Sequence, residues 1–504
     1  MNTFINIIVF ILFLFSLTFY SFLYLSGQIN IFNSDSLLLP SFISSLTDGH
    51  SFKDWVLPPG NSIFPEGLLF YLSNFFSNSV FFQYYIVNIL TFLITYFVMF
   101  KFAKFINSDF PYFISTFSIS ILIILGSMDI TPYKNMLYTT YHYGSFLNLL
   151  LALLVISMIL FETNFNNRLY LILALIICTF SIFSDRLFVV QFLLPFVFSY
   201  ILFYLNFYFI KIQKVFFYII LTFFIAFIFS YLLGNLLIIH EWPSSPKIIL
   251  FGLNPFVIIN HLNFQLENFY KMILRLFYSN RIFFIFIIFL YLSLFYKLII
   301  QKSYIQDKYS LRSTFLLYFI FTSLFLNIIV LFLINYPIHH RYFLTFSFFP
   351  IFGMMLIFKN KITNLTLIFS FLLIIIFAVF KDSDIKNFSI KDFEFEYYTK
   401  DHKCIDSYIE KFNLSSGISH YVNARYFSIF LKNDVNIYPY REDLTPDYKA
   451  SSKKGFKFND FDFVLLDSSK NDYKIYLKNM IKILGYPLNS ATCGRYDLKV
   501  YKKP

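Results

Sequence analysis

Charged residues are scarce in this sequence. Asp, Glu, Lys and Arg make up only 13% of its 504 residues, whereas hydrophobic residues make up 58%, and the mean hydropathy is +0.66. A water-soluble fold of this length could not cover so much apolar surface with polar side chains. The scarcity of charge therefore excludes a soluble protein and indicates a polytopic membrane protein.

Motifs for several chemistries are also missing. The chain has no P-loop, no GxGxxG, no HExxH, no GxSxG and no CxxC, so nothing supports nucleotide-driven transport or zinc proteolysis. Aromatic residues are abundant, with 76 Phe and 39 Tyr. On a membrane helix such side chains normally face lipid or pack in the core, so their abundance predicts no ligand.

Apolar runs long enough to cross a bilayer, which takes about 17–25 residues each, predict about eleven membrane spans. The first run lacks a basic leader and a small-residue cleavage site, so we expect a retained span rather than a signal peptide. A shorter apolar stretch at 65–77 predicts an interfacial or re-entrant helix. The predicted spans lie near residues 4–25, 82–100, 111–127, 143–161, 169–184, 187–210, 215–239, 281–300, 313–335, 343–358 and 362–380.

The positions of Lys and Arg predict the orientation, because short cytoplasmic loops carry the excess of these residues. With a cytoplasmic N-terminus, one register places the following basic residues between spans inside: Lys101, Lys104, Arg168, Lys211, Lys214, Lys297, Lys302, Lys308, Arg312, Lys359 and Lys361. The large first loop, residues 30–67, and the C-terminal tail then lie on the extracytoplasmic side. The net charge of +12 follows from topology and a solvated tail, and we expect no nucleic-acid partner.

Composition changes after residue 380, which predicts a membrane domain over 1–380 and a small soluble α/β domain over 381–504. Helices are expected near 404–412, 424–432 and 473–484, and strands near 417–423, 435–440, 462–467 and 496–502. Cys404 and Cys493 lie in this domain, on the predicted oxidising side. A disulfide between them would join the first helix to the last strand, the alternative being two unpaired thiols.

Three carboxylates fall on the predicted extracytoplasmic side. Asp35 follows the first span, Glu66 starts the short helix after Pro65, and Asp129 follows the third span. Each alone is explained by a solvated loop acid or a helix-start charge. Three acids on one face of a mostly uncharged protein favour a shared site, where partial desolvation can tune a carboxylate as a base or metal ligand.

The first loop resembles that of the polytopic glycosyltransferases of the GT-C superfamily, and most closely a group of uncharacterised bacterial membrane proteins of that type. The loop carries Ser34-Asp35-Ser36-Leu37-Leu38-Leu39-Pro40, Asp54-Trp55 and Phe64-Pro65-Glu66. The resemblance continues in Tyr141-His142-Tyr143-Gly144, Ser184-Asp185-Arg186, His340-Arg341-Tyr342, Cys404-Ile405-Asp406 and Ser419-His420-Tyr421-Val422-Asn423-Ala424-Arg425. This chain departs from that group in Glu66, where an Asp is usual, and in His420-Tyr421-Val422, where a Tyr-Trp pair is usual.

The resemblance implies an enzyme of a bacterial inner membrane that transfers a sugar from a polyprenyl-phosphate carrier to an extracytoplasmic acceptor, which is a surface glycan, a lipid or a protein. Asp35 is then the general base. Glu66 and Asp129 are candidates to bind the acceptor or a metal, and their oxygen ligands suit Mg²⁺ or Mn²⁺.

The carrier phosphate requires positive charge as it departs. Arg341 and Arg186 are the candidates to bind it, since a guanidinium matches phosphate geometry, and His340 and His142 are second donors. The alternatives are a local Asp185–Arg186 ion pair and a turn at 339–342 that merely anchors helices at the interface.

Trp55 has two interpretations. Its ring could stack on a sugar, or it could belong to the headgroup belt in which tryptophan is common.

The main rival function is a transporter or lipid flippase without glycosyl transfer. Such proteins usually place charged or helix-breaking residues within their spans and show internal repeats, whereas here the acids cluster in loops. Two further alternatives remain. One is a non-catalytic anchor whose tail binds a partner, and the other is an O-acyltransferase using a membrane histidine, for which His142 is the candidate.

Overall fold

The computed structural model describes residues 2–27, 29, 31–58, 60–106, 108, 110–138, 142–161, 167–207, 210–237, 240–241, 255–279, 281–303, 308–333, 342, 344–357, 397–433, 435–448, 451–452 and 461–501. The chain forms two compact units. The first unit comprises Met1–Ile29, Asn88–Leu233 and Pro246–Phe393, and the second comprises Asn30–Val87, Gly234–Ser245 and Glu394–Pro504. Residues 30–87 thus group with the C-terminal part, and the predicted domains 1–380 and 381–504 stay a prediction.

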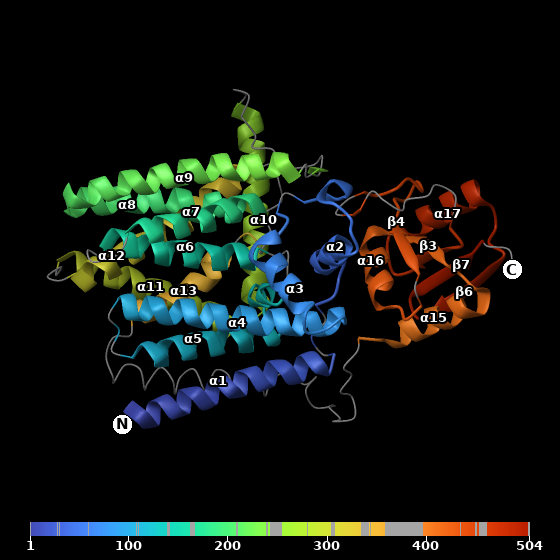
Figure 1. The fold of residues 1–504 in the computed structure, drawn as a ribbon, viewed down its shortest axis with the longest axis horizontal. Helices are drawn as coiled ribbons and strands as arrows, with labels where there is room; N and C mark the ends of the chain where they lie inside the picture. Colours follow the sequence, from blue (N-terminus) through green and yellow to red (C-terminus); the bar gives the residue numbers. More distant parts are fainter. Residues whose placement is uncertain are drawn as a thin grey trace. The chain divides into compact units, whose positions relative to one another are not determined.

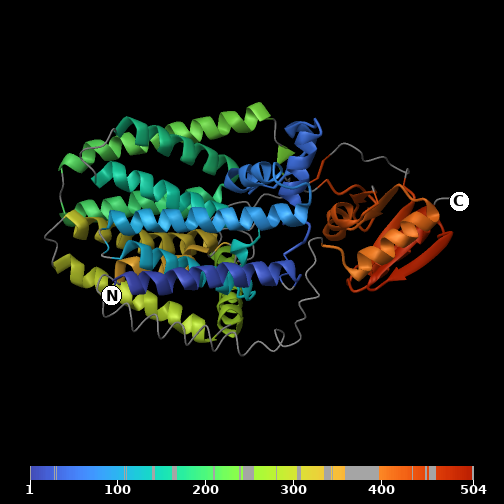
Figure 2. The ribbon, with the colours of Figure 1, turned by 60° about the horizontal axis from the view of Figure 1, so that its bottom comes forward.

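The first unit is helical, and most of its helices run side by side (Figures 1 and 2). α1 lies against α5, α6 against α7, α8 against α12, and α11 against α13. α4 begins in the second unit and continues into the first. The helices are α1 (Asn2–Leu25), α4 (Val80–Phe105), α5 (Pro111–Ser127), α6 (Tyr143–Phe161), α7 (Asn167–Ser184), α8 (Leu194–Phe207), α9 (Ile210–Leu237), α10 (Pro255–Ser279), α11 (Arg281–Ser303), α12 (Lys308–Leu333) and α13 (Leu344–Ile357), with the short turns η3 (Tyr133–Met136) and η4 (Val189–Leu193).

Seven helical stretches among the described residues are long and apolar enough to cross a membrane: Asn6–Leu25, Val80–Phe105, Tyr143–Phe161, Val189–Phe207, Val215–Leu237, Phe283–Ile300 and Tyr309–Val330. Three more predicted spans form shorter apolar helices, Pro111–Ser127, Arg168–Ser184 and Leu344–Ile357. The predicted span at 362–380 lies outside the described residues. The protein is therefore membrane-embedded, while the count of eleven spans stays a prediction.

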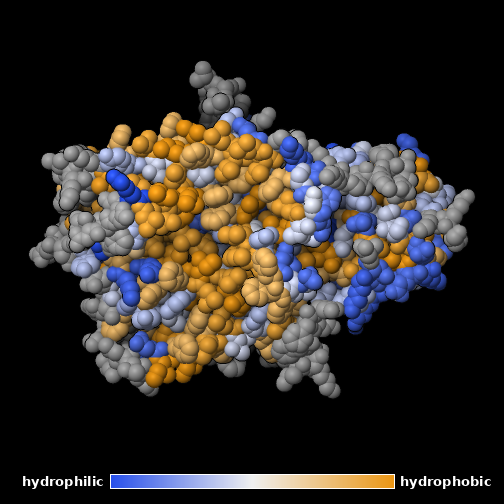
Figure 3. Space-filling model, viewed as in Figure 1, coloured by the Kyte–Doolittle hydropathy of each residue, from blue (hydrophilic) through white to orange (hydrophobic). Residues whose placement is uncertain are grey.

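Exposed apolar stripes on these helices match a lipid environment. α9 exposes Phe217, Leu221, Phe224 and Ile228, which follow one another at the three- and four-residue spacing of one helix face. In water such a face would be unstable. Figure 3 shows the corresponding apolar surface over the helices of the first unit.

The second unit begins with the residues of the predicted first loop, which form short elements rather than open chain. They are α2 (Leu38–Thr47), η1 (Phe52–Asp54), β1 (Val56–Leu57), η2 (Ile63–Gly67) and α3 (Leu68–Ser73). β1 pairs in parallel with β2 (His240–Glu241). The helical stretch from Ile63 to Ser73 covers much of the short helix predicted at 65–77.

The C-terminal part of the second unit is an α/β layer structure. Its sheet has the order β4-β3-β5-β7-β6. β3 pairs in parallel with both β4 and β5, whereas β7 pairs antiparallel with both β5 and β6. The strands are β3 (Ser416–Ser419), β4 (Asn436–Pro439), β5 (Phe463–Asp467), β6 (Asn489–Cys493) and β7 (Tyr496–Val500), and the helices are α15 (Lys400–Phe412), α16 (Tyr421–Phe430) and α17 (Tyr473–Leu484).

Both faces of this sheet are buried, which explains the continuous apolar run of β5. Phe463 and Leu465 point into a core shared with α15 and α16, whereas Val464 and Leu466 point into a core shared with α17. Alternate side chains of a strand face opposite sides of its sheet, so a strand covered on both sides needs apolar residues throughout.

Cys404 and Cys493 form the predicted disulfide, with their Cα atoms 5.6 Å apart. Cys404 lies in α15, as expected. Cys493 ends β6, a strand that the sequence did not predict. The remaining cysteine, Cys178, is a buried free thiol in α7.

Candidate functional site

Asp35 lies in a capped turn that leads into α2. The Asn33 side chain accepts a hydrogen bond from the Ser36 backbone N–H at 2.9 Å, and the Ser36 hydroxyl accepts one from the Asn33 N–H at 2.9 Å. This reciprocal pair closes a tight turn at residues 33–36. Asp35 lies within that turn, three residues before α2 begins at Leu38.

The C-terminal part reaches Asp35 through α16. The Tyr421 hydroxyl donates to Asp35 Oδ1 at 2.8 Å, and Arg425 Nη1 donates to the Ser34 carbonyl oxygen. Ser34 Oγ lies 2.5 Å from the Tyr421 carbonyl oxygen and 2.7 Å from that of Val422. Residues four apart share one face of a helix, so Tyr421 and Arg425 hold neighbouring residues of the first loop together.

The start of α16 is itself fixed locally. The His420 side chain caps the helix by accepting a hydrogen bond from the Val422 N–H at 3.3 Å. Behind the contact face, Ala424 and Phe427 are buried in the core beneath the sheet. Tyr421 therefore projects from a helix that is anchored on its other side.

Tyr421 remains a hydrogen-bond donor to the carboxylate. Burial raises the pKa of the Tyr421 hydroxyl above its ordinary value, Arg425 opposes this increase, and the Asp35 charge adds to it. A phenol beside a carboxylate keeps its proton, because losing it would place two negative charges in contact. From the sequence, Tyr421 and Arg425 were recognised only as part of the tail motif at residues 419–425. The structure shows which residues they contact.

Glu66 is buried in η2, with 6% of its surface exposed. The next residue, Gly67, packs against α2, because a Cβ atom at Gly67 would lie 3.8 Å from Leu39 Cδ2. The two acid-bearing segments of the first loop are thus neighbours within the second unit. Glu66 therefore stays a candidate site residue of the first loop, buried in the segment next to α2.

Trp55 does not have the open face that sugar stacking requires. Its side chain is only 4% exposed, its ring packs edge-on against Phe42 with centroids 5.4 Å apart, and its indole N–H donates to Ser45 Oγ at 2.7 Å. The backbone of Trp55 also bridges to Ser452. Trp55 is therefore a core residue of the second unit, and its sugar-stacking role stays a prediction.

Asp129 lies in the first unit just after α5, with a left-handed backbone at φ +55°. Its carboxylate forms a 3.0 Å ion pair with Lys134 and its side chain is 75% exposed. These contacts match a solvated loop acid, the simpler of the two sequence interpretations. An exposed pair of this kind contributes little to stability.

His142 and Asp185 are in close contact in the first unit. His142 Nδ1 lies 2.5 Å from Asp185 Oδ2, and the two side chains are only 11% and 8% exposed. The other carboxylate oxygen of Asp185 accepts the Leu187 N–H at 2.9 Å. Arg186, the adjacent residue and a predicted phosphate ligand, is exposed.

Most of the sequence at residues 339–342 lies outside the described residues. His340 and Arg341, two predicted phosphate ligands, lie outside the described residues. Tyr342 is described, and its ring centroid lies 5.3 Å from that of His142. Of the HHRY sequence, Tyr342 therefore lies beside the ring of His142.

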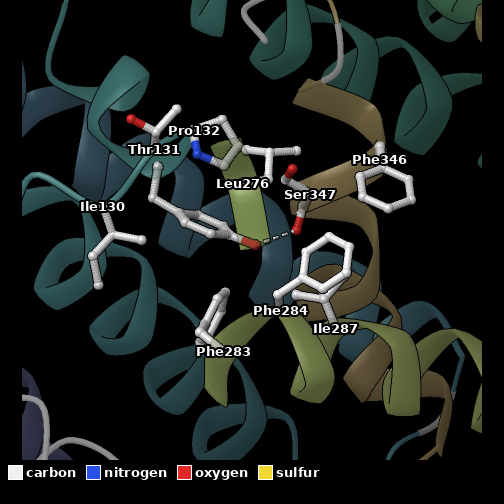
Figure 4. A pocket seen from close by; sticks show the side chains of 10 residues that line it. Ile130, Thr131, Pro132, Leu276, Phe283, Phe284, Ile287, Phe346 and Ser347 are labelled. Atoms are coloured by element: carbon white, nitrogen blue, oxygen red, sulfur yellow. Dashed lines mark hydrogen bonds between the residues drawn. The ribbon is translucent and has the colours of Figure 1, made fainter. Parts of the chain in front are cut away.

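A small apolar cavity lies in the first unit near the start of α13 (Figure 4). Its volume is about 20 Å³, which is room for about one water molecule and far too little for a sugar. Pro350 lacks an N–H, so the Phe346 carbonyl loses its helical partner, and the Tyr291 hydroxyl donates to it at 2.7 Å. Tyr133 donates to the Ser347 carbonyl at 2.9 Å. The cavity is thus part of the packing around a proline in α13.

Among the described residues, no three His, Cys, Asp or Glu side chains gather in a group that could hold a metal ion. The predicted Mg²⁺ or Mn²⁺ therefore has no such site within those residues.

Comparison with protein-family models, curated proteins and solved structures finds no match to this chain. The GT-C resemblance therefore stays a prediction from the motifs themselves. Two of those motifs, Ser34-Asp35 in the first loop and Tyr421 to Arg425 in the tail, lie in contact in the second unit.

Proposed function

We propose that this protein is a GT-C-type membrane glycosyltransferase that moves a sugar from a polyprenyl-phosphate carrier to an acceptor hydroxyl on a glycan, lipid or protein. The observation that carries the proposal is the hydrogen bond from Tyr421 to Asp35. It joins the loop acid of the resemblance to a tail motif 386 residues away in sequence. A non-catalytic membrane anchor would not need this contact. A general base, in contrast, requires a carboxylate that is held in a fixed orientation.

The chemistry assigned to Asp35 is proton abstraction. The acceptor oxygen forms a bond to the anomeric carbon of the sugar, and the bond from that carbon to the carrier phosphate breaks. The electron pair of the broken bond leaves with the phosphate oxygen, and the acceptor's proton passes to the Asp35 carboxylate. A base must lie about 2.6–3.2 Å from the hydroxyl it deprotonates. Tyr421 binds Oδ1 and so fixes the rotation of the carboxylate.

The proposed topology is that of a bacterial inner-membrane protein with about eleven spans, a cytoplasmic N-terminus and an extracytoplasmic second unit. Two observations support it. The basic clusters between predicted spans fall on one side, and the Cys404–Cys493 disulfide suits an oxidising compartment.

The test compares membranes carrying wild-type protein, Asp35→Asn or Asp48→Asn with radiolabelled polyprenyl-phosphate sugars. Asp48 is an exposed acid that ends α2 in the same segment, so Asp48→Asn controls for loss of a loop charge. Loss of a general base lowers the rate by about 10²–10⁴-fold, and we expect that loss for Asp35→Asn only.

Equal transfer by wild type and Asp35→Asn would remove Asp35 from the mechanism. If the wild type binds no lipid-linked sugar, the glycosyltransferase proposal itself fails. Translocation of the lipid-linked sugar across the membrane without transfer would instead identify a flippase.

A further inference from the structure

α10 has the length of a membrane span but not its composition. It covers 25 residues, Pro255–Ser279, yet it is not among the described helical stretches that are apolar enough to cross a membrane. Its exposed residues include the charged side chains of Glu267, Lys271 and Arg275. Charges are costly inside hydrocarbon, so an orientation along the surface of the bilayer is the more favourable one for this helix.

The buried side of α10 packs against the ends of neighbouring helices in the first unit. Met272 and Leu276 form an apolar cluster with Phe284, Phe332 and Phe346, which lie near the start of α11, the end of α12 and the start of α13. α11 and α12 are both long and apolar enough to cross a membrane, and the ends of spanning helices mark the edge of the hydrocarbon. Figures 1 and 2 show α10 running across the direction that most helices of this unit share.

Two rows of exposed residues run side by side along the outer surface of α10. Within each row the residues are four positions apart, so they lie above one another on the helix. The apolar row consists of Leu262, Leu266 and Tyr270. The charged row consists of Glu267, Lys271 and Arg275. An apolar flank beside a basic flank is the pattern of a helix that lies in the plane of the membrane interface.

The charge along this surface is positive on balance. Glu267 Oε1 lies 2.6 Å from Lys271 Nζ, in a pair whose side chains are both more than 60% exposed, and such exposed pairs are weak. Arg275 adds a second cation. Arg281, an exposed residue at the start of α11, adds a third, with its guanidinium carbon 5.3 Å from the ring centroid of Tyr278. Three cations beside one carboxylate attract anions.

We infer that α10 is an interfacial helix that binds anionic phospholipids. The apolar row lies at the boundary between headgroups and acyl chains, and the cations contact the lipid phosphates, whose geometry a guanidinium matches. Lipid is the occupant because the bilayer around α11 and α12 ends at the level where α10 packs, and the excess of cations selects an anionic headgroup. The inference requires only that the first unit is embedded in a membrane, so it does not depend on the proposed glycosyl transfer.

The test uses the full-length protein in phosphatidylcholine nanodiscs, with a bimane fluorophore attached through Tyr270→Cys in a Cys178→Ala background. Tyr270 is 62% exposed, and Cys404 and Cys493 are joined in a disulfide, so the label is confined to position 270. The quenchers are phosphatidylcholine or phosphatidylglycerol with a nitroxide near the top of one acyl chain, and aqueous iodide. We expect both lipids to quench, the phosphatidylglycerol at a lower mole fraction, and iodide to have little effect.

Matched variants test the role of the cations. A cation near the bilayer surface contributes about fivefold to the attraction of anionic lipid. Lys271→Gln combined with Arg275→Gln should therefore raise the phosphatidylglycerol needed for half-maximal quenching roughly 25-fold. The phosphatidylcholine titration should not change, which also shows that the variant is folded and inserted. Lys474→Gln combined with Lys478→Gln is the control, because these exposed lysines have the same spacing on α17 of the second unit, and it should change neither titration.

Four results would overturn the inference. Quenching by iodide and not by lipid would show that α10 faces water, whereas quenching by neither would show that protein covers the apolar row. Equal quenching by the two lipids in the wild type would remove the selection of an anionic headgroup. An equal loss of selectivity in the α17 control would assign the selectivity to the overall charge of the protein instead of to α10.

Discussion

The disulfide between Cys404 and Cys493 gives the sharpest stability prediction. It spans 89 residues of sequence, and the loop-entropy relation for a crosslink of that length gives about 4.6 kcal/mol of stabilisation at 25 °C. Replacing both cysteines by alanine should therefore remove roughly that free energy of unfolding from the second unit. At about 2–4 °C per kcal/mol for a domain of 150–250 residues, the unfolding midpoint falls by roughly 9–18 °C.

Alanine is preferred to serine because Cys493 is buried in an apolar core, where an unpaired hydroxyl would add its own cost. Cys178→Ala is the matched control, since Cys178 is a buried thiol without a crosslink. The assay is thermal unfolding of the purified full-length protein with and without reductant. Reductant should lower the wild-type midpoint and leave the double alanine variant unchanged.

A maleimide reagent of high mass checks the pairing directly. Denatured, unreduced protein should gain one adduct at Cys178, and reduced protein should gain adducts at all three cysteines. Three adducts without reduction, in protein isolated from cells, would refute both the disulfide and the extracytoplasmic placement it supports, because such bonds persist in oxidising compartments.

Two further predictions concern the second unit. Tyr421→Phe removes the donor to Asp35, and because a hydrogen bond to a charged group is worth about 1.5–3 kcal/mol, the free energy of unfolding of the second unit should fall by about that amount. The initial transfer rate should fall as well, because the Asp35 carboxylate is no longer held in one orientation. Burial lowers the pKa of His402 to about 4, against the opposing charge of Asp406. The unfolded chain then binds the extra proton first as the pH falls below about 6.5, so stability is complete above that pH and declines towards pH 4. Unfolding at pH 5 should cost about 2 kcal/mol less than at pH 7.5, and His402→Gln should flatten that dependence; an unchanged slope in the variant would contradict the assignment.

Hydropathy and strand patterning predicted much of the secondary structure, for physical reasons. A backbone in lipid must satisfy its hydrogen bonds internally, so a long apolar run such as Tyr143–Phe161 becomes a helix. The helix predicted at 473–484 also forms at those residues. β6 was missed because Asn489–Cys493 is polar, lies at the sheet edge and pairs with β7 alone, so it has no apolar alternation to detect.

The site was harder to predict because its contacts are distant in sequence. The position of Asp35 after a span indicated a functional acid, but nothing local connects it with Tyr421. The sequence feature that could have indicated this contact is the spacing of Tyr421 and Arg425, which lie one helical turn apart after a short strand. For Asp185, nothing local in the sequence indicates its contact with His142, which lies 43 residues away.

The disulfide and the candidate base are connected through one core. Cys493 belongs to the same buried cluster as Ala424 and Phe427, which anchor α16 from behind, and Tyr421 reaches Asp35 from the other side of that helix. A site residue is only as well placed as the packing that holds its partner. Loss of the Cys404–Cys493 crosslink should therefore reduce transfer before the second unit unfolds, since α16 would loosen first. Full activity in a reduced, still folded protein would show instead that Asp35 is held by the first loop alone.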